Sequence, residues 1–314
     1  MFHDIYEFAD ALKSILEKRM EDSEIEVREV EKNNSVILTG ITVRQKGSSI
    51  APNIYINKFY EAYQDGMELQ EIVGEIERIC KSEKEPALQD FHVEELTDFE
   101  KIRDKISFKL VNAEKNKNRL KTMTHRMFLD LDITYDVRVT EINDAVGSVA
   151  VTNDMMKAWD VTEEQLYELA LQNAVKQDRG VVKPLESLMQ EWFGGDAETD
   201  EKDHTYKDFD ISIAEEIQET ALYVATNQSK TNGASIMLFP NFPDTVGMLL
   251  GDYFVLPSSI HEILLLPADG AMESSELLKM VHEVNATAVA AEEVLSENIY
   301  RYDVAKKTLS VIEA

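Results

Sequence analysis

Short apolar runs separated by tight turns are the feature that most constrains the fold of this chain. The segment YFVLPSSIHEILLLP at 253–267 places one such run on each side of Pro-Ser-Ser, a combination that favours a turn. Residues 24–30 and 36–43 repeat the arrangement around Lys32-Asn33-Asn34. Paired runs of this length predict β-hairpins. We therefore expect sheets built mainly from antiparallel strands.

Helical periodicity appears between these runs. Apolar residues recur every three or four positions in 5–16 and 69–79, which predicts amphipathic helices. Thr162 with Gln165 forms a capping signature for a further helix. Further strands are predicted at 106–110, 128–139, 147–151, 221–225, 234–239, 300–302 and 308–312. Because strands do not alternate regularly with helices, the pattern predicts an α+β fold with mixed, mostly antiparallel sheets and helices packed on them, rather than a doubly wound parallel sheet.

A polar stretch divides the chain. Residues 81–90, KSEKEPALQD, contain Pro86 and lack apolar periodicity, as is typical of a linker. For a chain of 314 residues, two lobes are expected because single cores seldom grow further. We predict an N-terminal α+β lobe at 1–90 and a larger α+β lobe at 91–314. Within the larger lobe, the acid-rich segment 194–210 is predicted to be mobile.

The net charge limits the partners. Sixty Asp and Glu residues face 32 Lys and Arg, which gives a formal charge of −28. Phosphates would be repelled, so we expect no direct binding of nucleic acid. The single cysteine, Cys80, excludes an internal disulfide and fits a reducing compartment. We predict a cytoplasmic protein with no signal peptide and no membrane association, since its apolar runs are too short to span a bilayer.

Residues 101–126 reverse this charge. The window holds nine Lys and Arg residues against Asp104 and Glu114, so its net charge is 9 − 2 = +7. One hypothesis is an interaction patch that contacts phosphate or an acidic partner. Its residues would be Lys109, Lys115, Lys117, Arg119 and Lys121. The alternative is internal charge balance, in which the window faces the segment 194–210 or a second subunit. We favour charge balance, because exposed charges are usually only solvated.

Motifs for catalysis are weak. The sequence contains no glycine-rich phosphate loop, and no cofactor is predicted. The hairpin places Ser258, Ser259, His261 and Glu262 within five positions, and these residues are weak candidates for catalysis. Adjacent residues on a strand point to opposite faces, so His261 and Glu262 cannot both serve one site directly. A structural turn is the favoured interpretation.

Three aspartates form the strongest metal candidate. Asp130, Asp132 and Asp136 lie at even spacing within FLDLDITYDVRV, with His125 just upstream. Carboxylates are suitable ligands for Mg²⁺ or Mn²⁺. The alternative is a strand with one face in water, where the acids are solvated and residues such as Leu131 and Ile133 point inward. Alternation alone explains the pattern, so we favour the solvated face.

Several phrases resemble a known family. These are IRDKISFKLVNAEKNKNRLKTMTHRMFLDLDITYDVRV, WDVTEEQLYELALQNA, YFVLPSSIHEILLLP and VNATAVAAEEVLSENIYRYD. Together they resemble a family of uncharacterised proteins with a domain of unknown function, common in gut Clostridia and related Firmicutes. The middle and C-terminal phrases are more distantly similar to a second uncharacterised bacterial family. The resemblance implies a bacterial, cytoplasmic protein. It carries no known catalytic residues.

Three functional hypotheses follow. The first is a non-catalytic cytoplasmic interaction protein with an acidic surface and one basic patch, which binds a protein partner or itself. This hypothesis predicts that the double substitution Lys117→Glu with Arg119→Glu abolishes binding of the partner. The second is an enzyme of unrecognised type, with a site near 257–262 or a divalent-metal site near 130–136. The third is an acidic nucleic-acid mimic, because an acidic surface can compete with DNA for a partner.

Overall fold

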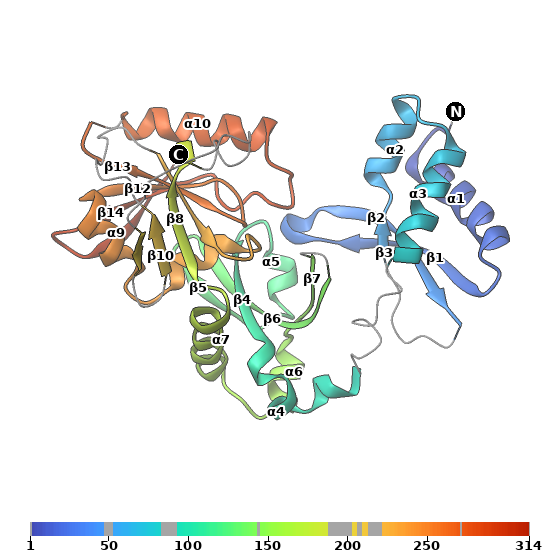
Figure 1. Ribbon diagram of the computed structural model, residues 1–314, viewed down its shortest axis with the longest axis horizontal. Coiled ribbons are helices and arrows are strands. Elements are labelled where there is room, and N and C mark those ends of the chain that lie inside the picture. Colours follow the sequence, from blue (N-terminus) through green and yellow to red (C-terminus); the bar gives the residue numbers. More distant parts are fainter. Residues whose placement is uncertain are drawn as a thin grey trace. The chain divides into compact units, whose positions relative to one another are not determined.

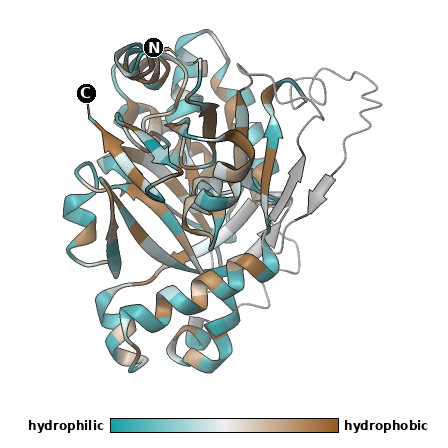
Figure 2. Cartoon of the chain, turned by 90° about the vertical axis from the view of Figure 1, so that its left-hand side faces the viewer, coloured by the Kyte–Doolittle hydropathy of each residue, from teal (hydrophilic) through white to brown (hydrophobic). Residues whose placement is uncertain are grey.

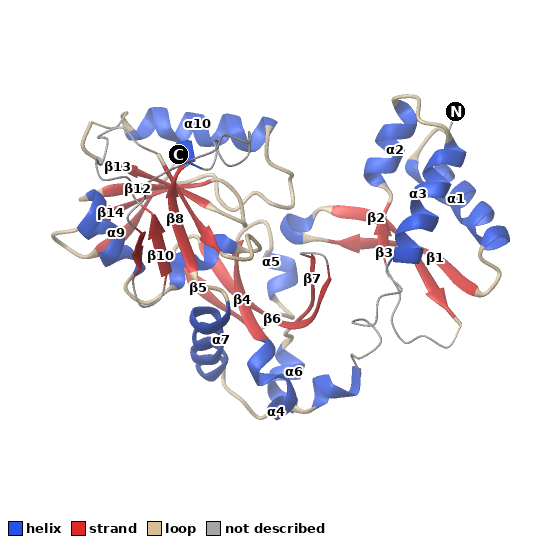
Figure 3. Cartoon of the chain, in the orientation of Figure 1, coloured by secondary structure: helices blue, strands red, loops and turns tan. Residues whose placement is uncertain are grey.

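The computed structural model describes residues 2–46, 53–82, 93–142, 145–187, 203–205, 209–212, 222–270 and 272–313. Over these residues the chain has an α+β fold with three mostly antiparallel sheets, which confirms the predicted class (Figure 3). It divides into two compact units, Met1–Leu96 and Thr97–Ala314. Of the predicted linker 81–90, residues 83–90 lie outside the described residues.

The first unit is a three-stranded sheet with three helices. Its elements are α1 (Ile5–Arg19), β1 (Ser23–Glu31), η1 (Asn33–Ser35), β2 (Ile37–Gln45), β3 (Asn53–Tyr55), α2 (Asn57–Gln64) and α3 (Leu69–Ser82). The Asp4 side chain caps α1 by accepting from the backbone of Tyr6 and Glu7. β1 pairs antiparallel with β2 from Ser23↔Gln45 to Glu31↔Ile37. The predicted N-terminal hairpin is therefore confirmed.

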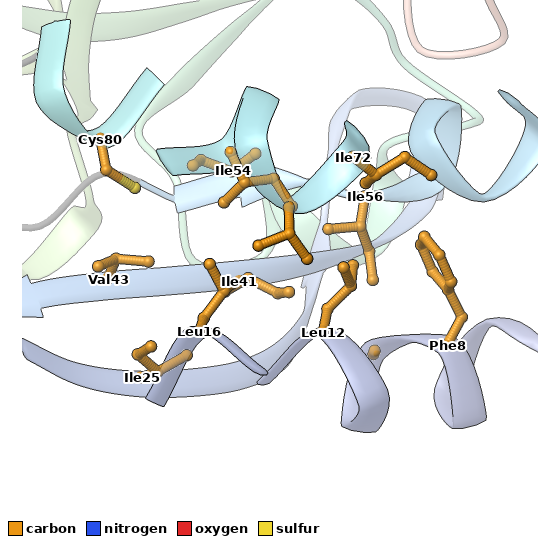
Figure 4. Packing of buried hydrophobic residues seen from close by; sticks show 13 residues of the cluster. Phe8, Leu12, Leu16, Ile25, Ile41, Val43, Ile54, Ile56, Ile72 and Cys80 are labelled. Atoms are coloured by element: carbon orange, nitrogen blue, oxygen red, sulfur yellow. The ribbon is translucent and has the colours of Figure 1, made fainter. Parts of the chain in front are cut away.

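The helices of this unit bury one face of its sheet. Phe8, Leu12 and Leu16 of α1 share a core with Ile25 of β1 and Ile41 of β2 (Figure 4). Strand neighbours point the other way: Glu24, Glu26 and Arg44 are exposed. Apolar residues at every second position thus select the face that the helices cover.

The second unit begins with a four-stranded sheet. After η3 (Val93–Thr97), which spans the division between the units, its elements are α4 (Phe99–Ile102), η4 (Arg103–Lys105), β4 (Ile106–Asn112), α5 (Lys117–Leu120), β5 (His125–Phe128), β6 (Leu131–Ile142), β7 (Ala145–Ala150), α6 (Asn153–Ala158) and α7 (Glu163–Gln177). β6 is central, with β4 along one edge and both β5 and β7 along the other. The predicted capping box of Thr162 and Gln165 starts α7. Tyr167 of α7 stacks on Phe108 of β4.

An eight-stranded sheet completes the second unit, in the order β15-β14-β12-β13-β11-β8-β10-β9. Figure 1 labels its strands β8, β10, β12, β13 and β14. Its strands are β8 (Gly180–Pro184), β9 (Asp203–Thr205), β10 (Phe209–Ser212), β11 (Tyr223–Asn227), β12 (Tyr253–Pro257), β13 (Ile263–Pro267), β14 (Ile299–Asp303) and β15 (Thr308–Ile312). Only the β8–β10 pair is parallel among the described strands. β12 and β13 form the predicted hairpin.

Helices cover both faces of this larger sheet. α10 (Ser274–Thr287) packs Leu277 and Leu278 against Phe254 and Leu256. On the opposite face, α9 (Phe242–Leu250) lies over β12, where the Tyr253 hydroxyl donates to the carbonyl of Pro243. Figure 2 shows hydrophobic and hydrophilic residues alternating along the surface helices. No helix in the described part of the chain is long and apolar enough to cross a membrane.

The strand predicted at 234–239 is wrong: residues Gly233–Leu238 form the 3₁₀ helix η5, and all six are buried. A short apolar run buried on every side has no periodicity that separates strand from helix. The segment 194–210, predicted to be mobile, falls largely outside the described residues. Its described parts are β9 and the start of β10.

Candidate functional site

A row of polar side chains occupies one face of β6. Asp132, Thr134 and Asp136 alternate with Leu131, Ile133 and Tyr135, and all six are buried. The expectation that the acids lie on a face in water is therefore wrong, since Asp132 is 6% and Asp136 is 4% exposed. Alternation shows which residues share a face, but not whether that face is covered. A carboxylate that is buried in this way needs a hydrogen-bond or ion-pair partner.

Lys109 is the partner of Asp136. Its Nζ lies 2.8 Å from Asp136 Oδ2, and the two side chains are 20% and 5% exposed. Ser107, also on β4, donates from Oγ to the carbonyl of Asp136. Taking both charges out of water costs free energy that their attraction offsets only with good geometry. The short distance satisfies this condition.

His125 is the partner of Asp132. Its Nδ1 lies 2.8 Å from Asp132 Oδ1, and the imidazole is 39% exposed. A carboxylate at Nδ1 favours the tautomer that leaves Nε2 able to accept a proton. Thr134 lies opposite both His125 and Lys109 in the strand register. Its Oγ1 is buried and has no hydrogen-bond partner among the described residues.

The three aspartates of the predicted metal set are not brought together. Asp130 precedes β6 and accepts from Ser296 Oγ at 2.6 Å and Asn298 Nδ2 at 3.1 Å. Asp132 and Asp136 stand four residues apart on one strand, or about 13 Å. Metal–oxygen bonds measure only about 2.0 to 2.6 Å. No group of three or more metal-binding side chains occurs in the described ranges.

A second polar cluster surrounds Asp178, which follows α7. Asp178 is 3% exposed, and its carboxylate accepts from Arg138 Nη2 at 3.2 Å, Asn227 Nδ2 at 2.9 Å and both the backbone and side chain of Ser229. An adjoining pocket of about 10 Å³ is lined partly by Ser107 and Arg138, which is room for about one water molecule. Sequence reasoning missed this cluster, because its members are remote in the chain and form no motif.

The hairpin candidates bond to one another. Ser258 Oγ donates to Glu262 Oε1 at 3.3 Å, and Ser259 Oγ accepts from the His261 backbone at 3.0 Å. His261 Nδ1 accepts from the backbone of Asn232 at 3.2 Å. His261 Nε2 lies 3.7 Å from Glu293. Both ring nitrogens therefore face groups other than a serine hydroxyl, and these contacts brace the turn.

Most cations of the basic window have acidic partners. Lys115 Nζ lies 2.9 Å from Glu297, and Lys117 pairs with Glu114. Further pairs join Lys101 to Asp98, Arg103 to Glu100 and Arg126 to Glu163 and Glu164. Lys121 donates to Asn118 Oδ1 at 2.9 Å. Arg119, among the described residues, has no acidic partner. The partners of these pairs lie outside the segment 194–210.

Arg126 is the most strongly held of these cations. Its Nε and Nη2 donate to Glu163 at 2.8 to 3.0 Å, and its guanidinium lies 4.4 Å from the ring centre of Tyr167. The hydrogen bonds that Arg126 donates to Glu163 raise the pKa of Arg126. Burial, with Glu163 as a further cause, raises the pKa of Tyr135. Both groups keep their protons at neutral pH, so the cluster fastens β5 and β6 to α7.

Comparison with known proteins gives one match. A model described as a family of unknown function (DUF5688) matches residues 5–304, which agrees with the resemblance noted in the sequence. No curated protein and no solved structure matches the chain.

Proposed function

Because the chain belongs to a family of unknown function, DUF5688, we propose from its own residues that it is a non-catalytic interaction protein whose acidic surface binds a basic protein partner. We also place it in the cytoplasm. Its single cysteine, Cys80, is buried, and a chain with one cysteine forms no internal disulfide, as is usual for a protein of a reducing compartment.

The pairing of the basic window supports this proposal most directly. Lys109, Lys115, Lys117 and Arg126 each contact a carboxylate, so the basic window 101–126 is largely neutralised by these described partners. The excess of 60 acidic residues over 32 basic residues then makes the protein surface negative. A negative field of this kind attracts basic partners and repels phosphate groups.

Affinity capture tests the proposal. The tagged full chain is used as bait in lysate of its own cells, at low salt and at about 0.15 M salt, where the Debye length is about 8 Å. We expect a stoichiometric partner with a basic surface that is lost as salt rises. Capture of an acidic partner, or of a basic one indifferent to salt, contradicts the proposal. Displacement of the partner by added DNA would favour the mimic instead.

The His125–Asp132 pair favours a second candidate function. A buried carboxylate orients the imidazole, and the exposed ring could take a proton from a bound substrate. An enzyme of this type predicts that the full chain hydrolyses a substrate such as a p-nitrophenyl ester. Its activity would fall in His125→Gln while the Tm stays unchanged. Equal activity in wild type and His125→Gln rejects a role for this pair.

A further inference from the structure

β1 is an edge strand whose outer side has no neighbouring strand among the described residues. The order β1-β2-β3 leaves it with one neighbour in the described part of the sheet. Backbone bonds from Lys46 N to Asp22 O and from Lys32 N to Val36 O fix its orientation. In an antiparallel pair, residues bonded to the partner strand recur at every second position. Even-numbered residues therefore bond to β2, and odd-numbered residues direct their N–H and C=O groups outward.

Four consecutive outward positions are available. Ile25, Val27, Glu29 and Glu31 form no backbone hydrogen bond on this side with any described residue. Unpaired groups in a row are a template for an added strand. The strand is nine residues long, so it offers a full-length edge rather than a short remnant.

Acidic side chains flank this edge on both faces. Glu24 and Glu26 are on the face away from the helices, with side chains 63% and 57% exposed. Glu29 and Glu31 are exposed on the other face. Arg44 contacts Glu24 and Glu26 at 3.4 and 3.5 Å, and Arg28 is the one basic residue within β1. Cross-strand pairs of opposite charge stabilise a sheet.

We propose that the outer edge of β1 is the docking surface for the basic partner, which adds an extended segment carrying Lys or Arg as a fourth strand. The inference rests on the proposed function, because it supplies a surface for that partner. Main-chain bonds provide affinity in this mode, and side chains provide selection. A second copy of the chain is disfavoured as the occupant. It would bring another net charge of −28 and set four glutamates of β1 against four more.

A defined peptide tests the edge. The probe is a peptide of alternating Lys and Thr, matched to the nine residues of β1, and the control alternates Glu and Thr. Fluorescence anisotropy on the full chain should detect binding of the Lys peptide alone. Hydrogen exchange should show new protection at the amides of Ile25, Val27, Glu29 and Glu31. Protection at the even-numbered amides should stay unchanged, since these already bond to β2.

A matched pair of variants isolates the backbone contribution. Glu29→Pro removes an outward N–H without removing a bond to β2, whereas Glu29→Ala loses the same carboxylate and keeps the donor. We expect Glu29→Pro to weaken peptide binding about tenfold and Glu29→Ala to weaken it far less. Circular dichroism checks the fold of each. If Glu29→Pro unfolds, Glu31→Pro with Glu31→Ala repeats the comparison at the strand end.

The outcomes separate two failures. One contrary result is that the Lys peptide binds without protecting the odd-numbered amides, and another is that it binds Glu29→Pro and Glu29→Ala with equal affinity. Either result rejects docking on the outer edge of β1 but leaves the proposed acidic interaction protein intact. Absence of peptide binding also overturns the edge, and lysate capture then decides the proposed function independently. A dimer seen by sedimentation that Glu29→Pro abolishes would overturn the basic occupant in favour of a second copy.

Discussion

At the scale of single residues, a buried charge in this protein depends on the groups that pair with it. Lys109 and Asp136 illustrate this, because both are mostly withdrawn from water. We expect Asp136→Ala to lower the free energy of unfolding by roughly 3 kcal/mol, since it leaves the ammonium uncompensated. Urea titration measures the loss. The double variant Lys109→Met with Asp136→Leu should recover most of it. A full loss in the double variant would mean that the ion pair itself stabilises the fold.

The carboxylate of Glu297 makes stability depend on pH. Partial burial raises its pKa, but hydrogen bonds from Lys115 and Asn285 outweigh this and leave the pKa below its ordinary 4.5. A carboxyl with a lowered folded pKa contributes stability above the unfolded value and loses it as the pH falls. Glu297→Gln should therefore lose less stability than wild type when urea titrations are repeated below pH 4.5. Glu283→Gln, on the exposed face of α10, is the control and should follow wild type.

Residue patterns revealed some of these groups and not others. Even spacing predicts that Asp132 and Asp136 share one face of a strand, and His125 lies just upstream in the sequence. The cover over that face could not be predicted, because alternation carries no information about neighbouring elements. Lys115 and Glu297 are 182 positions apart, and no local signal joins such pairs.

At the scale of elements, two glycines should respond in opposite directions. A Cβ added at Gly233 in η5 would collide with the hydroxyl of Thr226 and the carbonyl of His261, whereas one added at Gly74 in α3 meets nothing within 4 Å. We expect Gly233→Ala to destabilise by roughly 3 kcal/mol and Gly74→Ala to stabilise by about 0.5 to 1 kcal/mol. Thermal unfolding of both variants tests this. A tolerated Gly233→Ala would show that η5 can shift away.

Elements with a local signal were predictable. The hairpins of β1–β2 and β12–β13 follow from turn residues between apolar runs, and α7 follows from its capping box. The strand predicted at 234–239 is wrong because two features favour η5 there. Asn232 adopts a left-handed conformation, with φ of 54°, and the surroundings of Gly233 are closely packed. Both depend on tertiary contacts.

At the scale of the whole molecule, each unit should fold alone. The core of the first unit draws all its buried members from residues 8–80, and the structure divides after Leu96. We expect fragments 1–96 and 97–314 each to unfold cooperatively in calorimetry, as domains with their own cores do. A fragment 1–96 without a cooperative transition would mean that its core depends on the rest of the chain.

If acidic charge drives the binding of a basic partner, that binding must weaken as salt screens the charges. The dissociation constant of the full chain for the partner recovered by capture should be measured as salt rises from low ionic strength to about 0.15 M, where surface charges are screened beyond about 8 Å. We predict that affinity falls steadily with salt. An affinity that is unchanged or strengthened by salt would contradict an electrostatic interface.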